Sequence, residues 1–129
     1  MNEIDEPIRT FYIAGVQHHQ MHRALDDIVI GDNLMLTRET RPEILKYDPN
    51  AVRIDYARHD KQVMLGFVPM KFTPQIAGLM EIGIRLECVV IEFNKTAKPW
   101  EQCKVEIREV EYGAVEKAIL RSVGLEVEE

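Results

Sequence analysis

The sequence lacks most features that mark an enzyme, a secreted protein or a membrane protein. It has only two cysteines, Cys88 and Cys103, one tryptophan, and 7% aromatic residues among 129. No apolar run approaches the roughly 18 residues needed to cross a bilayer, and the acidic N-terminus lacks a signal peptide's basic and then apolar pattern. We expect a soluble, cytoplasmic, single-domain protein over residues 1–129. Both cysteines fall in predicted strands, which favours free, buried thiols over a disulfide between neighbouring strands.

Catalytic motifs are also missing. The chain has no glycine-rich phosphate loop, no GxSxG elbow and no paired CxxC motifs. His18, His19 and His22 could begin a metal site, but the sequence indicates no further ligand, so a solvated histidine cluster is favoured. Asp48 and Asp55 could divide acid and base work, although Asp55 belongs to the outward set of its strand and we expect it to be solvated. We predict no enzymatic activity, no metal and no cofactor.

The net charge of −6 by itself disfavours a nucleic-acid partner, because such binding depends on cations that neutralise phosphate. The acids concentrate at the two ends of the chain, however, and residues 7–100 are close to neutral. A local cationic face is therefore compatible with the composition.

Hydrophobic alternation and β-branched residues predict a mainly β fold. A helix over 74–82, with Thr73 as its N-cap and Gly83 as its stop, separates the fourth and fifth strands, and a C-terminal helix is expected over 114–122, within an acidic extension over 111–129. Gly66 suggests a bulge or a close backbone approach. Short connections favour a small six-stranded antiparallel barrel with the first helix as a lid. The predicted strands cover 8–14, 33–39, 51–57, 62–69, 84–93 and 103–110.

Residues 47–54, reading YDPNAVRI, combine a turn with the start of a strand. Asp48 is suited equally to capping the turn and to accepting a hydrogen bond from a ligand hydroxyl. Tyr47 and Trp100 lie in predicted loops, where they are candidates to stack on unpaired bases. Phe67 is another candidate, although its position in a strand favours the core.

Four segments, in this order and spacing, resemble the HIRAN domain family. They read FYIAGVQHH at 11–19, LMLTRE at 34–39, YDPNAVRI at 47–54 and LGFVP at 65–69, the last followed by a helix. The resemblance covers about residues 8–95. It implies a modified oligonucleotide-binding (OB) barrel that holds the 3′-hydroxyl end of single-stranded DNA, as an accessory to DNA repair or replication.

The resemblance also implies roles for individual residues. Tyr47 would stack on the terminal base, Asp48 would accept the hydrogen bond from the 3′-hydroxyl, and Asn50 would brace the turn or touch the last nucleotide. The remaining contacts are expected from Gln17, His18, His19, Arg53, Phe67, Lys71 and Trp100.

The chain departs from the family at two positions that carry cations in DNA-binding members. Gln17, His18 and His19 stand where those members have a basic residue followed by aromatics, and Met70 stands in place of a lysine, with Lys71 adjacent. We therefore expect weaker binding, which strengthens below about pH 6.5 if the imidazoles contribute.

Two other functions are compatible with the sequence. The net acidity favours a protein-interaction or self-association domain that uses the same groove and binds no DNA. Metal-dependent hydrolysis through the histidine cluster ranks last.

Overall fold

The computed structural model describes residues 7–16, 19–58 and 61–110, with residues 119 and 124. The predicted C-terminal helix and the acidic extension lie outside the described residues, apart from these last two positions. Strands and helices follow one another as β1 (Arg9–Tyr12), η3 (Met21–Arg23), β2 (Asn33–Arg38), α1 (Pro42–Leu45), β3 (Val52–Arg58), β4 (Lys61–Phe67), η4 (Met70–Phe72), α2 (Thr73–Glu81), β5 (Leu86–Phe93), η5 (Pro99–Glu101) and β6 (Cys103–Glu109).

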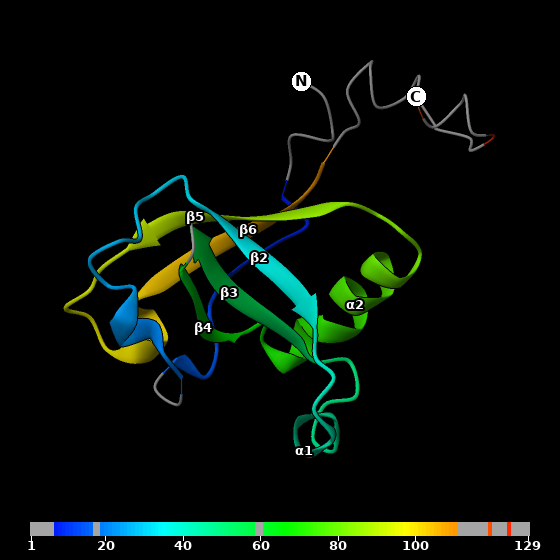
Figure 1. The fold of residues 1–129 in the computed structure, drawn as a ribbon, viewed down its shortest axis with the longest axis horizontal. Helices are drawn as coiled ribbons and strands as arrows, with labels where there is room; N and C mark the ends of the chain where they lie inside the picture. Colours follow the sequence, from blue (N-terminus) through cyan, green and yellow to red (C-terminus); the bar gives the residue numbers. More distant parts are fainter. Residues whose placement is uncertain (1–6, 17–18, 59–60, 111–118, 120–123, 125–129) are drawn as a thin grey trace.

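All six strands predicted from the sequence are present, and they form one antiparallel sheet in the order β1-β6-β5-β2-β3-β4. β2 belongs to both halves of the sheet. Its first residues, Asn33 and Leu34, pair with β5, and the stretch 35–38 pairs with β3. The sheet therefore bends at β2, and Figure 1 shows this strand crossing between the two halves.

The sheet is not closed into a barrel, so the predicted barrel and its OB-like details are not confirmed. Within the described residues, β1 and β4 form the two edges, and one isolated antiparallel bridge, between Ala14 and Phe67, connects the chain beyond β1 to the end of β4. Both backbone hydrogen bonds of this bridge measure 2.9 Å. Gly66 lies beside the bridge, in the strand pair whose register shifts between Ile54 and Asp55, so the prediction of a bulge or close approach is confirmed.

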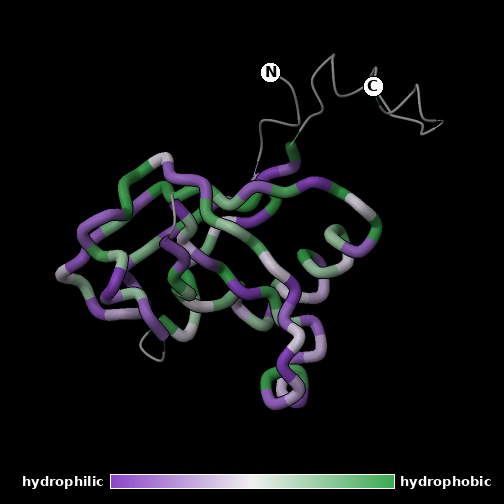
Figure 2. The backbone as a smooth tube through the Cα atoms, viewed as in Figure 1, coloured by the Kyte–Doolittle hydropathy of each residue, from purple (hydrophilic) through white to green (hydrophobic). Residues whose placement is uncertain are grey.

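The hydrophobic core contains side chains from every strand and from α2. Val52, Ile54 and Tyr56 alternate into it from β3, as the sequence predicts. Figure 2 shows hydrophobic and hydrophilic residues alternating along the strands instead of forming one long apolar block. The other core residues that the strands and α2 contribute are Phe11, Leu34, Val63, Leu65, Ile76, Ala77, Cys88, Val90, Cys103, Val105 and Ile107.

Both cysteines are free and buried, so the favoured interpretation is confirmed. Burial raises the pKa of the Cys103 thiol to about 12, and burial raises that of Cys88 further. Desolvation disfavours the charged thiolate, so both groups behave as small apolar side chains.

The one-turn helix α1, which the sequence did not predict, begins at Pro42, four residues after the end of β2, where the fixed φ of proline suits the first helical position. One local prediction about a helix is wrong. Thr73 does not cap α2. It is the first helical residue, and the cap position belongs to Phe72, which makes no side-chain cap hydrogen bond. The hydroxyl of Thr73 instead lies within hydrogen-bond distance of two acceptors, Asp48 Oδ2 at 2.7 Å and the Met70 carbonyl oxygen at 2.9 Å. In Figure 1, α2 lies beside the sheet and α1 projects away from it.

No helix in the described part of the chain has the length and apolarity to span a membrane.

Candidate functional site

A pocket of about 260 Å³ lies where the YDPN turn meets the end of β4. Segments far apart in sequence converge there: the chain beyond β1, the end of α1 with the following turn, the residue before β3, and the chain from β4 into η4. The Ala14–Phe67 bridge brings the first and last of these together. Apart from Asp48 and the Tyr47 hydroxyl, the lining is apolar. The lining residues are Ala14, Gly15, Ile44, Tyr47, Asp48, Ala51, Phe67, Val68 and Met70.

Tyr47 is the exposed wall of this pocket. Its side chain is 76% exposed, and its backbone N–H donates to the carbonyl of Ile44, 3.0 Å away. The short helix α1, which the sequence did not predict, therefore sets the position of the tyrosine. A ring that is open to solvent on one side and adjoins an apolar recess on the other offers a stacking surface for a flat ligand.

Asp48 is half-buried, and both of its carboxylate oxygens already accept hydrogen bonds. Oδ1 accepts from the backbone N–H of Asn50 at 2.9 Å, and Oδ2 accepts from the Thr73 hydroxyl at 2.7 Å. The turn-capping role predicted for Asp48 is therefore present. Each carboxylate oxygen has a second acceptor position, so Asp48 can still accept from a ligand while its orientation is fixed.

The backbone of Asn50 braces the turn, as one of its two predicted roles required. Its neighbour Pro49 accepts a hydrogen bond through its carbonyl from Arg38 Nη2 at 3.1 Å, and Nη1 of the same guanidinium pairs with Glu81. Together with Thr73 at the start of α2, Arg38 ties the turn to both ends of that helix. Sequence reasoning missed Arg38 and Thr73 as supports, because 25 residues separate Thr73 from Asp48 and no local pattern indicates the contact.

Phe67 lies in the pocket wall and not in the core cluster, so the preference for the core is wrong. His19 packs edge-on against it, with ring centroids 5.2 Å apart. The structure therefore brings His19 to the pocket, whereas Gln17 and His18 lie outside the described residues.

Lys71 and Trp100 do not line the pocket. Lys71 follows the lining residue Met70 in η4, and its Nζ lies 5.0 Å from the centroid of the Phe72 ring. Trp100 lies in η5 between β5 and β6, with Lys98 Nζ 5.7 Å from its ring centroid. None of the described lining residues is a lysine or arginine.

Asp55 is buried, with 1% of its surface exposed, so the prediction of a solvated carboxylate is wrong. It accepts hydrogen bonds from Arg53 Nε and Nη2, each at 3.1 Å, and from Gln62 at 2.8 Å. Its position on the strand does point away from the core, but side chains of the same face cover it. The charge of Arg53 is thus paired within the protein.

In the described residues, no three histidine, cysteine or acidic side chains gather at a site that could hold a metal ion.

The comparisons with known proteins agree with this architecture. The HIRAN domain family matches residues 10–109, most of the chain. A crystal structure of a protein from Lactobacillus plantarum, determined by a structural genomics consortium, has a similar fold, with a TM-score of 0.66 and 20% sequence identity over 82% of this chain and 95% of that one. No curated protein matches. The chain belongs to the HIRAN domain family, whose members are in general nucleic-acid-binding modules.

Proposed function

We propose that this domain is a non-enzymatic module that binds the 3′-hydroxyl end of single-stranded DNA in the Tyr47–Asp48 pocket. The observation that carries the proposal is the joint opening of an exposed aromatic ring and a fixed carboxylate into one apolar recess. Pockets for drug-sized ligands begin at roughly 300 Å³, and this recess of about 260 Å³ is slightly smaller. It therefore suits a group smaller than a whole nucleotide, such as the base or the sugar of the terminal residue.

The chemistry of Asp48 supports recognition of a hydroxyl rather than a phosphate. A carboxylate accepts the hydrogen bond of a free 3′-hydroxyl and repels the negative charge of a 3′-phosphate. The bonds from Asn50 N–H and the Thr73 hydroxyl hold the group in place before the ligand arrives, and such preorganisation lowers the entropic cost of binding. Tyr47 stacks on the terminal base, and Phe67, with His19 packed edge-on against it, lines another part of the recess.

Fluorescence anisotropy with short 5′-labelled oligonucleotides tests the proposal. Oligonucleotides that end in a 3′-hydroxyl are expected to bind more tightly than those that end in a 3′-phosphate. Asp48→Asn keeps an acceptor for the Asn50 N–H and removes the charge, so it should reduce this preference. Glu43→Gln is the matched control, because it removes one charge from the exposed face of nearby α1. Equal binding of the two ends by the unaltered protein would refute the proposal.

A protein-interaction role for the same groove is the second candidate. It is favoured by the apolar lining and by the exposure of Met70 next to Tyr47. Light scattering discriminates between the two: a stable oligomer that Tyr47→Ala dissociates, with no oligonucleotide binding, would support this second role.

A further inference from the structure

Two arginines and two acids form a charge cluster on the outer face of the β2–β3–β4 half of the sheet, beside the pocket. Its members are Glu39, Arg41, Arg53 and Asp55. Arg53 Nη2 lies 3.1 Å from Asp55, Arg53 Nη1 lies 4.0 Å from Glu39, and Arg41 Nε pairs with Glu39. Glu39 therefore lies between the two guanidinium groups and joins the four side chains into one unit.

This cluster adjoins the pocket through the register of β3 and β4. Arg53 is the direct partner of Phe67, and directly opposed residues of an antiparallel pair point to the same face of the sheet. Arg53 also follows the lining residue Ala51 by two positions, which is about 7 Å along a strand. The cluster therefore begins two residues along the chain from the recess that the terminal nucleotide would occupy.

The charges of the cluster are layered. The side chains of Glu39 and Asp55 are each 1% exposed, whereas those of Arg41 and Arg53 are 43% and 28% exposed. A ligand on this face therefore meets guanidinium groups first and carboxylates only beneath them. The cluster as a whole is neutral, but because its arginines cover its acids, it presents positive charge at the surface of a chain whose net charge is −6.

The buried acids also fix the arginines without using all their donors. A guanidinium has five N–H donors. Arg53 uses Nε and Nη2 on Asp55, and its Nη1 is too far from Glu39 for a hydrogen bond. Arg41 uses Nε on Glu39 and Nη2 on the sulfur of Met64. Donors held at fixed positions suit the bidentate recognition of phosphate oxygens.

We infer that Arg41 and Arg53 form a subsite for an internucleotide phosphodiester of the strand whose 3′ end occupies the pocket. The inference rests on the proposed function, and it supplies phosphate contacts that the pocket itself lacks. A strand that leaves the pocket over β3 would pass its last phosphates across this pair.

Methylphosphonate substitution tests the subsite, because it removes the charge of a single chosen phosphate. In the unaltered protein, replacing one of the two phosphates nearest the 3′-hydroxyl is expected to weaken binding about tenfold, the equivalent of about 1.4 kcal/mol. The double variant Arg41→Gln/Glu39→Gln leaves no unpaired buried carboxylate and retains only Arg53 in the subsite, so the same replacement should weaken its binding clearly less than it weakens binding by the unaltered protein. The salt dependence of log K should also lose about 0.7 for each phosphate contact removed.

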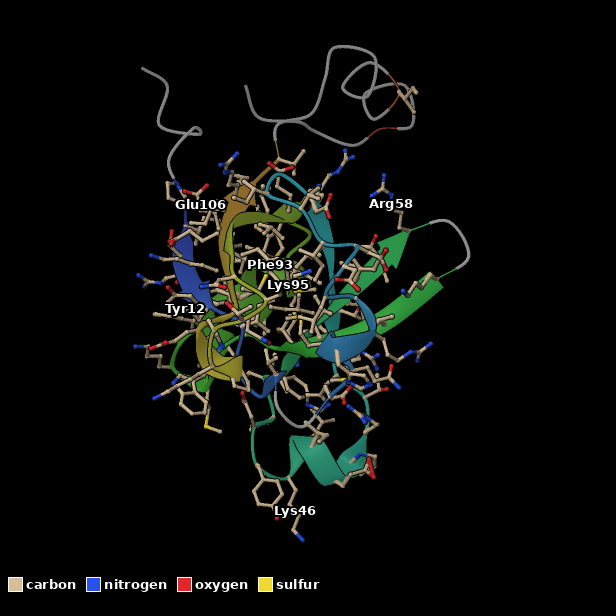
Figure 3. All side chains as sticks on the ribbon, turned by 90° about the vertical axis from the view of Figure 1, so that its left-hand side faces the viewer. Tyr12, Lys46, Arg58, Phe93, Lys95 and Glu106 are labelled. Carbon is tan, nitrogen blue, oxygen red and sulfur yellow. The ribbon has the colours of Figure 1, made fainter. Side chains whose placement is uncertain are left out.

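Two further variants separate a direct contact from a general change in charge or stability. Glu39→Gln alone removes the acid beneath the arginines and is expected to tighten oligonucleotide binding. The control Lys61→Gln/Asp27→Asn removes another half-exposed ion pair, at the opposite end of β4 from Phe67, and should leave the methylphosphonate effect unchanged. Arg58, near this end of the hairpin, lies far from Lys46, which adjoins Tyr47 in sequence, as Figure 3 shows. Thermal unfolding of each variant reports whether it is folded.

The outcomes distinguish the subsite from the proposed function. If 3′-hydroxyl ends are preferred but methylphosphonates cost the same in the arginine variant, the subsite is wrong and the proposed function stands. If no oligonucleotide binds, or if an acidic peptide binds through the arginines instead, both are overturned.

Discussion

Gly66 provides the sharpest stability test of the architecture around the pocket. A Cβ at this position would lie 2.3 Å from the carbonyl oxygen of Ala14 and 2.8 Å from Cγ2 of Ile13. Carbon and oxygen atoms ordinarily approach to about 3.3 Å at closest, so Gly66→Ala requires the backbone of β4 and the chain beyond β1 to separate by roughly 1 Å.

A separation of that size breaks both 2.9 Å hydrogen bonds of the Ala14–Phe67 bridge, since hydrogen bonds weaken beyond about 3.2 Å. Each lost bond costs about 0.5–1.5 kcal/mol, and overpacking adds about 1–3 kcal/mol. Gly66→Ala should therefore reduce the free energy of unfolding by roughly 2–6 kcal/mol. With a urea m-value of about 2 kcal/mol/M, the midpoint would fall by about 1–3 M.

Gly78→Ala is the matched control, because it makes the same chemical change with the opposite expected sign. Gly78 lies within α2, and apart from its chain neighbours and the backbone of its own helix, a Cβ there would have no atom within 4 Å. Alanine is better than glycine in a helix by about 0.8–1.0 kcal/mol, so this variant should be more stable than the unaltered protein. Urea unfolding of both variants decides the matter. A Gly66→Ala midpoint within error of the unaltered protein, or shifts of the same sign in both variants, would refute the bridge argument.

Three further predictions concern buried groups. Thr73→Val removes the hydroxyl that donates to Asp48, and loss of a hydrogen bond to a charged group should lower the free energy of unfolding by about 1.5–3 kcal/mol. Thr73→Ser retains the donor and is the control. Equal stability of the two variants in urea would contradict this role of the hydroxyl. Because burial raises the pKa of Cys103 to about 12 and raises that of Cys88 as well, neither thiol should react with Ellman's reagent at pH 8 until the protein unfolds. In the unfolded chain the thiols ionise near their ordinary pKa of about 8.5, whereas in the folded chain both stay protonated at that pH. The free energy of unfolding should therefore fall as the pH rises above about 8.5, and the contribution of Cys103 to this fall should end near its folded pKa of about 12. Cys103→Ala should lessen that fall.

The strands were predictable because their pattern is local. Val52, Ile54 and Tyr56 alternate with polar residues, and a period of two is enough to place them on one buried face. Gly66 was interpretable for a similar reason, since an isolated glycine in a strand has few other uses. The helix α1 was not predicted, because its four residues are too few to show a helical period, although proline is favoured at the first helical position.

Contacts between distant segments could not be predicted in the same way. Asp55 points away from the core, as its parity indicates, but its burial depends on Arg53 and Gln62 covering it. Phe67 has the composition of a core residue, and its place in the pocket wall follows from the bridge to Ala14. Such outcomes depend on tertiary packing, which a pattern along a single strand does not record.

The two roles weighed for Asp48 are not alternatives in this structure. An aspartate that only caps a turn needs one acceptor oxygen, and Asn50 N–H occupies Oδ1. The second bond, from the fully buried Thr73 hydroxyl, adds nothing to the cap and fixes the rotation of the carboxylate instead. A group held at both oxygens at the edge of an apolar pocket is suited to read a hydroxyl, because the acceptor positions that remain point in fixed directions. Under the proposed function, the cap is therefore the means by which Asp48 is positioned for its ligand.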